Sequence, residues 1–140
     1  MNIIHNREAH QFLCELEPHS VDITFTSPPY NRKRDDTYDH YSDTIPDYRA
    51  FLSSIITQCL RVTRRHVFIN IQMNYYNRRD VLKIMGEFAD SIQETFIWGK
   101  TNPKPSSGNS VTNSYEMILA LGETPLRSKT TYTKNLLSLS

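Results

Sequence analysis

Six consecutive residues, Thr26-Ser27-Pro28-Pro29-Tyr30-Asn31, combine a hydroxyl group, a proline pair and an aromatic ring in one short segment. They directly follow Val21–Phe25, an apolar and β-branched run that predicts a strand. The two prolines end that strand, because they donate no backbone hydrogen bond and fix φ. The segment therefore offers a side-chain acceptor, a stiffly held carbonyl acceptor and a ring that can stack on a flat ligand. The plain alternative is a turn that ends the strand and carries an incidental aromatic residue.

Glycine is scarce in this chain, which has only four: Gly86, Gly99, Gly108 and Gly122. No two of them have the spacing of a phosphate-binding or dinucleotide-binding loop. Such loops need glycine because the backbone must approach the ligand closely or adopt a positive φ. The sequence therefore contains no glycine-rich cofactor loop.

Apolar periodicity predicts an α/β fold in which helices and strands alternate. Helices are expected over residues 9–16, 46–62 and 77–89, and strands over 2–4, 21–25, 66–71, 92–98 and 115–121. Pro46 fits the first turn of the second helix, with Thr44 or Asp43 as its cap. We expect parallel strands at the centre of the sheet, a hairpin-like antiparallel pair at its end, and polar loops over 32–44 and 100–113.

Composition excludes several classes of protein. A chain of 140 residues with a formal net charge of +1 is one domain at most, and bulk charge does not indicate a nucleic-acid partner. The scattered histidines and the isolated Cys14 and Cys59 lack metal-ligand spacing, so no metal is expected and both thiols are predicted to be buried. No apolar run is long enough to span a bilayer, and no signal pattern begins the chain, so a cytoplasmic location is expected.

The Ser27-Pro28-Pro29-Tyr30 segment, placed after a strand, resembles the catalytic loop of the DNA amino-methyltransferases. These enzymes transfer a methyl group from S-adenosylmethionine to the exocyclic amino nitrogen of cytosine (N4) or adenine (N6). The resemblance implies that the Ser27 side chain and the Pro28 carbonyl accept the two amino hydrogens, while Pro29 stiffens the loop. It also implies that Tyr30 stacks on a flipped base and that Asn31 contacts the substrate. Serine at position 27, where many relatives have aspartate, slightly favours N4 of cytosine.

A second segment is similar to the part of that family thought to line the target-base pocket. It comprises residues 96–105, with Trp98, Lys100 and Asn102, and residues 113–119, with Glu116. Trp98 is either a core aromatic or a base contact. Lys100 and Lys104 either meet phosphate or form a solvated loop face. Glu116 either orients the loop or is an ordinary exposed carboxylate at a strand start. Trp98, Lys100 and Asn102 are taken as candidate substrate-binding residues.

The chain also departs from the family pattern. His5-Asn6 stands where relatives usually have Gly-Asp, so a site role for Asn6 is in doubt. The charges of Arg32, Lys33 and Arg34, candidates for contact with the DNA backbone, are largely cancelled by nearby aspartates (Asp35, Asp36, Asp39 and Asp43). The segment with Asp-Pro-Phe and a Gly-x-Gly turn, which wraps the methyl donor in relatives, has no counterpart here, so the cofactor-binding residues are unknown.

The resemblance therefore implies an incomplete Rossmann-like methyltransferase sheet over residues 1–122, followed by an irregular, basic, Ser/Thr-rich tail over 123–140. The missing strands would leave an apolar strand edge uncovered, so self-association or binding of a complementary cofactor-binding half is expected. The leading hypothesis is the target-base half of a methyltransferase acting on double-stranded DNA with S-adenosylmethionine, inactive by itself. The alternative is a non-catalytic remnant that binds DNA or a methyltransferase subunit. Methylation of RNA or of a protein amide is a weaker third hypothesis.

Overall fold

The computed structural model describes residues 2–32, 43–103, 105, 111–130 and 133–138. Within these ranges lie three α-helices, one short 3₁₀ helix and one sheet. The elements, in chain order, are α1 (Ala9–Glu15), β1 (Val21–Thr26), α2 (Tyr48–Val62), β2 (Thr63–Ile71), α3 (Arg78–Glu87), the 3₁₀ turn η1 (Ala89–Ser91), β3 (Ile92–Gly99), β4 (Tyr115–Leu121) and β5 (Leu136–Leu137).

The five strands form one open sheet in the order β1-β2-β4-β3-β5. β1 and β2 are parallel because α2 returns the chain between them, whereas β4 runs antiparallel to both of its neighbours, β2 and β3. The structure thus confirms the mixed α/β sheet with an antiparallel β3–β4 pair. The expected strand over residues 2–4 was wrong, because this stretch is irregular and Ile4 is 98% exposed.

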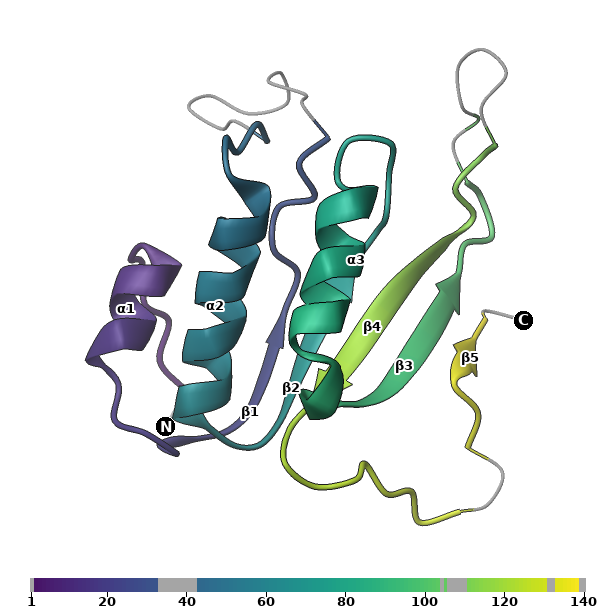
Figure 1. The fold of residues 1–140 in the computed structure, drawn as a ribbon. Helices are drawn as coiled ribbons and strands as arrows, with labels where there is room; N and C mark the ends of the chain where they lie inside the picture. Colours follow the sequence, from purple (N-terminus) through teal and green to yellow (C-terminus); the bar gives the residue numbers. More distant parts are fainter. Residues whose placement is uncertain (1, 33–42, 104, 106–110, 131–132, 139–140) are drawn as a thin grey trace.

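The helices cover one face of the sheet (Figure 1). α2 presents an apolar stripe at helical spacing, and the strands present alternate residues to it, so the two patterns meet in a single core. The core consists of Tyr48, Leu52, Ile55, Ile56 and Cys59 from α2, Val67, Ile69 and Ile71 from β2, Val81 and Ile84 from α3, and Met117, Leu119 and Leu121 from β4.

Helix α2 begins at Tyr48, two residues later than the sequence indicated. Its cap is Asp47, whose side chain accepts a hydrogen bond from the Ala50 amide at 3.1 Å. The expected caps, Thr44 and Asp43, were wrong, and Pro46 precedes the helix instead of lying in its first turn. Asp43 does not cap the helix, because it is buried beside the loop that follows β1 and accepts a hydrogen bond from the Asn31 amide.

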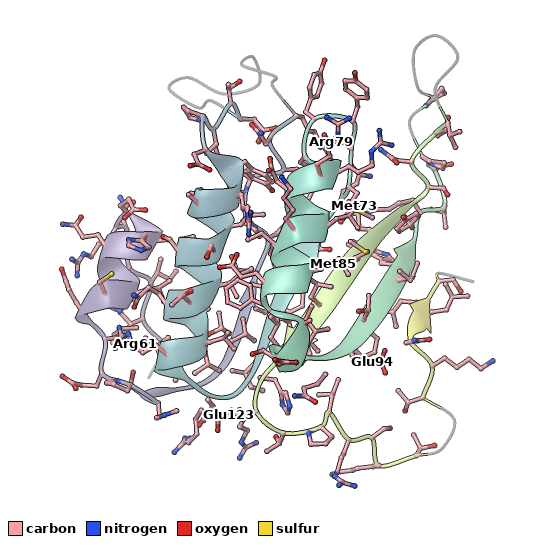
Figure 2. All side chains as sticks on the ribbon, viewed as in Figure 1. Arg61, Met73, Arg79, Met85, Glu94 and Glu123 are labelled. Atoms are coloured by element: carbon pink, nitrogen blue, oxygen red, sulfur yellow. The ribbon has the colours of Figure 1, made fainter. Side chains whose placement is uncertain are left out.

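One side chain of α2, that of Arg61, caps the carboxyl end of α1. The Arg61 guanidinium donates to the carbonyl oxygens of Leu13 and Leu16, both at 2.8 Å, and so satisfies the end of α1 (Figure 2). Cys14 lies on α1 and is exposed, so its predicted burial was wrong: no residue of this short helix is buried. Cys59 on α2 is buried as predicted, and burial raises the pKa of its thiol to about 11.

The opposite face of the sheet carries exposed apolar side chains. Ile23 is 51% and Phe25 is 63% exposed on β1, the first strand in the sheet order. Phe25 pairs across the sheet with Phe68 of β2, and their ring centroids are 6.2 Å apart. This end of the sheet thus combines a strand edge turned away from β2 with an apolar face.

Beyond Gly122 the described part of the tail is irregular except for β5, which the sequence did not predict. β5 pairs with β3 in parallel, matching Leu136 to Ile97 and Leu137 to Trp98. The division into a domain over 1–122 and a tail over 123–140 stays a prediction.

Candidate functional site

The Ser27–Asn31 loop leaves the sheet at the carboxyl end of β1, beside the carboxyl end of its parallel neighbour β2. In open α/β sheets this edge is where ligands bind, because loops diverge there and leave a crevice. Ser27 is exposed, Pro28 is buried and Tyr30 is half-buried. The loop therefore presents its hydroxyl outward while its prolines pack against the protein.

The backbone of this loop is fixed by three side chains from two other parts of the chain. The Tyr48 hydroxyl, at the start of α2, donates to the Pro29 carbonyl at 2.6 Å. The next carbonyl, that of Tyr30, accepts from Asn77 at 2.6 Å and from Asn74 at 3.0 Å. Tyr48 and Asn77 are 2% and 0% exposed, so these bonds lie in a dry environment where leaving them unmade is costly. The result is a preorganised loop.

Asn31 closes the loop. It has a φ of 52°, in the left-handed region that asparagine tolerates better than most residues. Its side-chain oxygen accepts from the Ile45 amide at 2.9 Å, and the amides of Asn31 and Arg32 donate to the Asp43 carboxylate at 3.1 and 2.7 Å. Asn31 is 4% exposed, which places it within the support of the loop. Its predicted contact with substrate stays a prediction.

A polar cluster, comprising Ser27, Tyr30, Asn70, Glu116 and Lys100, lies beside the loop, and within it Asn70 and Glu116 are buried. The Ser27 and Tyr30 hydroxyl oxygens are 2.9 Å apart, and the Tyr30 hydroxyl donates to Glu116 at 3.3 Å. The Asn70 amide nitrogen donates to both the Tyr30 hydroxyl, at 3.1 Å, and Glu116, at 3.0 Å. The sequence left open whether Glu116 orients the loop or is an exposed carboxylate. Because Glu116 is 8% exposed, the second interpretation is excluded.

Lys100 is held in place by two partners in this cluster. Its ammonium nitrogen lies 2.9 Å from Glu116 and 3.5 Å from the centroid of the Trp98 ring. Lys100, which was expected to meet phosphate or solvent, thus forms an ion pair and a cation–π contact, and the substrate-binding roles expected of Trp98, Lys100 and Asn102 stay predictions. Trp98 is half-buried and belongs to this arrangement, whereas Asn102 is exposed on the following loop. Lys104, Lys33, Arg34 and Asp35, Asp36 and Asp39 lie outside the described residues.

The charges of the cluster follow from these contacts. Burial opposes ionisation of Glu116, but hydrogen bonds from Lys100 and Asn70 outweigh it and hold the pKa of this carboxyl below its ordinary value. Burial, together with the nearby Glu116 charge, raises the pKa of Tyr30. At neutral pH the cluster therefore contains a carboxylate beside a protonated phenol. The guanidinium of Arg32 also lies 5.0 Å above the Tyr30 ring.

Sequence reasoning found the exposed half of this site and missed its support. Asn70, Asn74 and Asn77 were not singled out, and neither were Tyr48 and Asp43 as loop supports. A usable signal existed, because Asn70 is a polar residue inside an otherwise apolar run, near the end of the strand. Buried amides in such positions are retained only when they have partners.

The loop between β2 and α3 adds aromatic and basic groups at the same end of the molecule. Tyr75 is 81% and Tyr76 is 52% exposed, their rings meet edge to face, and Arg78 lies 6.0 Å from the Tyr75 ring. Arg79 is exposed at the adjoining end of α3 (Figure 2). Arginine and exposed tyrosine together provide groups that bind phosphate and stack on bases.

In the described part of the chain no group of three or more His, Cys, Asp or Glu side chains is arranged to hold a metal ion. None of the helices described is both long enough and apolar enough to cross a bilayer.

A family model described as DNA methylase matches residues 21–137. Among solved structures, the chain is similar to the cytosine-N4-specific PvuII DNA methyltransferase, with a TM-score of 0.70 and 17% identity over 96% of this chain and 55% of that one. It is also similar to TTHA0409, a putative DNA modification methylase from Thermus thermophilus complexed with S-adenosyl-L-methionine (0.53; 21% identity; 88% of this chain, 56% of that one).

A third solved structure, the M1.HpyAVI–SAM complex, matches with a TM-score of 0.52 and 15% identity over 96% of this chain and 65% of that one. At these identities the likenesses establish the fold: the open sheet is part of a methyltransferase fold. The chain spans between about half and two thirds of the length of these three structures.

Proposed function

Because the chain belongs to the family of DNA methylases, we propose that it is the target-base half of an enzyme that methylates an exocyclic amino group in double-stranded DNA inside the cell. One observation carries the proposal: the Ser27 hydroxyl is exposed on a loop whose backbone is fixed by Tyr48 and Asn77 at the carboxyl edge of β1. Serine at position 27 slightly favours N4 of cytosine over N6 of adenine as the target atom.

The chemistry suited to this loop is control of an amino group. An exocyclic amino nitrogen is a weak nucleophile because its lone pair is delocalised into the ring. The Ser27 oxygen and the Pro28 carbonyl oxygen would accept its two hydrogens and favour a pyramidal nitrogen with a localised lone pair. This arrangement stabilises charge that develops only in the transition state, which is the kind of interaction that raises a rate. Pro29 keeps the acceptors in place, and the Tyr30 ring offers a stacking surface.

The described residues offer no glycine-rich loop for S-adenosylmethionine, the methyl donor of this family. Gly86 lies within α3, Gly99 ends β3, and a Cβ on Gly122 would meet the Arg65 carbonyl oxygen at 2.8 Å. None of these glycines thus belongs to a loop that could wrap a nucleoside, and Gly108 lies outside the described residues. We therefore assign donor binding to a complementary half, supplied either by a second polypeptide or by further sequence of the same protein.

The exposed strand β1 is where such a half would join. A charge at Phe25 should weaken this association, because Phe25 is 63% exposed on the face beside the free edge. We expect Phe25→Asp to weaken self-association, or binding of the complementary half, about tenfold or more in sedimentation velocity. Leu82→Asp is the matched control, since Leu82 is 54% exposed on α3. Wild-type chain that stays monomeric and binds no second half would contradict this assignment.

The aromatic and basic loop beside the site should contact the DNA backbone. Replacing both Arg78 and Arg79 with alanine is expected to weaken binding to duplex DNA similarly for all sequences. It should also reduce the dependence of log Kd on log salt by about 1 per lost phosphate contact. Fluorescence anisotropy over a salt series measures both. Arg64→Ala, at the opposite end of β2 and exposed, is the control. An unchanged salt slope in the double variant would place the DNA elsewhere.

The direct test of the proposed function is reconstitution. The purified chain is mixed with the donor-binding half of a family member, S-adenosylmethionine and duplex DNA, and methylated bases are identified by mass spectrometry. Methylation at an amino nitrogen in the mixture, and not with either part alone, is expected. Repeated turnover by the chain alone would contradict the division into halves, and an inactive mixture that nevertheless forms a complex would contradict the catalytic assignment.

A second candidate is a non-catalytic remnant that binds DNA or a methyltransferase subunit. The lack of a glycine-rich loop favours it, because this sequence cannot form such a cofactor cradle. Reconstitution distinguishes the two functions, because a remnant binds DNA or the second half but gives no turnover in the mixture.

A further inference from the structure

We propose that Glu116 is a positioning residue that sets the direction of the hydrogen bonds through Tyr30 to Ser27, so that Ser27 faces the target amino group as an acceptor only. The proposal rests on the proposed function, because it concerns the same Ser27 oxygen. It adds a residue 86 positions away from Tyr30 in sequence, located on β4 at the far side of β2.

Counting protons along the chain of contacts gives this direction. An ionised carboxylate accepts hydrogen bonds and cannot donate one, so the Tyr30 hydroxyl donates its single proton to the hydrogen bond with Glu116. The Tyr30 oxygen then accepts from Asn70, at 3.1 Å, and has one acceptor position left for Ser27, at 2.9 Å. Ser27 must therefore donate its proton to Tyr30. Both lone pairs of the Ser27 oxygen remain available for an incoming N–H group.

Hydrogen bonds in the reverse direction would prevent Ser27 from accepting a hydrogen bond from the substrate. If Tyr30 donated to Ser27, the Ser27 proton would point toward the substrate and oppose the amino hydrogens. Lys100 opposes this reversal. Its ammonium group lies 2.9 Å from Glu116 and keeps the carboxylate charged, although Glu116 is only 8% exposed. The cation–π contact of Lys100 with Trp98 holds the ammonium group in turn.

The side chain of Asn70 is oriented in a way that supports hydrogen bonding from Ser27 through Tyr30 to Glu116. Both of its observed side-chain bonds are donations from the amide nitrogen, to Tyr30 and to Glu116, while its buried carbonyl oxygen has no partner among the described residues. Turning the amide over would place its oxygen against a carboxylate. A buried acceptor without a partner lowers stability, so its presence beside the loop points to a functional demand.

A double-mutant cycle in the reconstituted enzyme tests the proposal. Tyr30→Phe keeps the ring and removes the hydroxyl group, and Glu116→Gln allows donation toward Tyr30. Each is expected to lower kcat about tenfold, a loss comparable to one net hydrogen bond, with KM for DNA unchanged. Because Glu116 acts through the Tyr30 hydroxyl, the double variant should also be about tenfold slower. Glu123→Gln, an exposed site at the opposite end of the molecule, is the control (Figure 2).

The outcomes separate this proposal from the one on which it rests. Wild-type reconstitution without methyl transfer contradicts the proposed function. Wild-type activity with a double variant about a hundredfold slower shows that Glu116 acts independently of Tyr30, and unchanged kcat in Glu116→Gln shows that it does not act at all. Either result overturns the positioning role.

A second measurement needs no activity. In the isolated chain labelled with ¹³C-tyrosine, the Tyr30 resonance is identified by its loss in Tyr30→Phe and followed by NMR against pH. Burial and Glu116 both raise the pKa of Tyr30, so Glu116→Gln is expected to lower it relative to wild type, while Glu123→Gln leaves it unchanged. An unchanged pKa in Glu116→Gln would show that the two side chains do not interact in solution.

Discussion

Ser27→Ala is expected to reduce methyl transfer by the reconstituted enzyme about a hundredfold or more. The side-chain oxygen is one of only two acceptors offered to the amino hydrogens. Losing one preorganised group aimed at a developing charge typically costs about 10²–10³ in rate. The exposed position of Ser27 means that the fold should tolerate alanine. Single-turnover kinetics with excess enzyme measure the chemical step directly.

Two comparisons make this result specific. Ser20→Ala, an exposed serine before β1, should leave the rate unchanged. DNA binding by the Ser27→Ala variant should stay within about twofold of wild type, because the loss concerns an interaction that strengthens in the transition state. A variant that keeps its rate would remove the hydroxyl from the mechanism, and one that loses DNA binding equally would make Ser27 a ground-state contact.

Asn77→Ala is expected to lower the free energy of unfolding by about 2–4 kcal/mol, the largest effect on stability that we predict for a polar residue. Asn77 is fully buried, and its side chain bonds to the Tyr30 carbonyl, the Gln72 carbonyl and the Asn74 amide. Alanine leaves these backbone groups short of a partner. Urea denaturation followed by circular dichroism measures the change, which should appear as a lower midpoint with an unchanged slope.

The same substitution should loosen the catalytic loop before the chain unfolds globally. Amide hydrogen exchange at Asn31 and Arg32, whose N–H groups donate to Asp43, is expected to become faster in Asn77→Ala. Asn113→Ala, at an exposed asparagine, should change neither stability nor exchange. A loss below about 0.5 kcal/mol in Asn77→Ala would show that the loop is held mainly by Tyr48.

The sequence predicted the elements with strong periodicity and failed where the signal was short. The pattern from Phe51 to Val62 marked α2, because its apolar stripe repeats over several turns. Residues 2–4 are a very short stretch with no turn signal, so they were mistaken for a strand. The two-residue β5 was not predictable at all, since pairing with β3 and not local propensity makes it a strand.

The candidate site divides in the same way. Ser27 to Tyr30 form a local motif, so their types and order were legible in sequence. The support of that motif comes from α2, β2, the β2–α3 loop and β4, and only the fold shows that Asn70 and Glu116 meet Tyr30. Lys100 illustrates the difference: a lysine in a polar loop suggests phosphate or solvent, whereas only the fold shows its contacts with a buried carboxylate and an indole ring.

The two borders of the sheet are unequal, and this sets the stoichiometry of any assembly. β5 is too short to template another chain, and very short border strands discourage such pairing. β1, six residues long, lies at the opposite border. Two copies that paired through their β1 strands about a two-fold axis would leave neither β1 strand free for a further copy. Growth would stop at a closed pair, so an excess of this chain is expected to yield dimers and not fibrils.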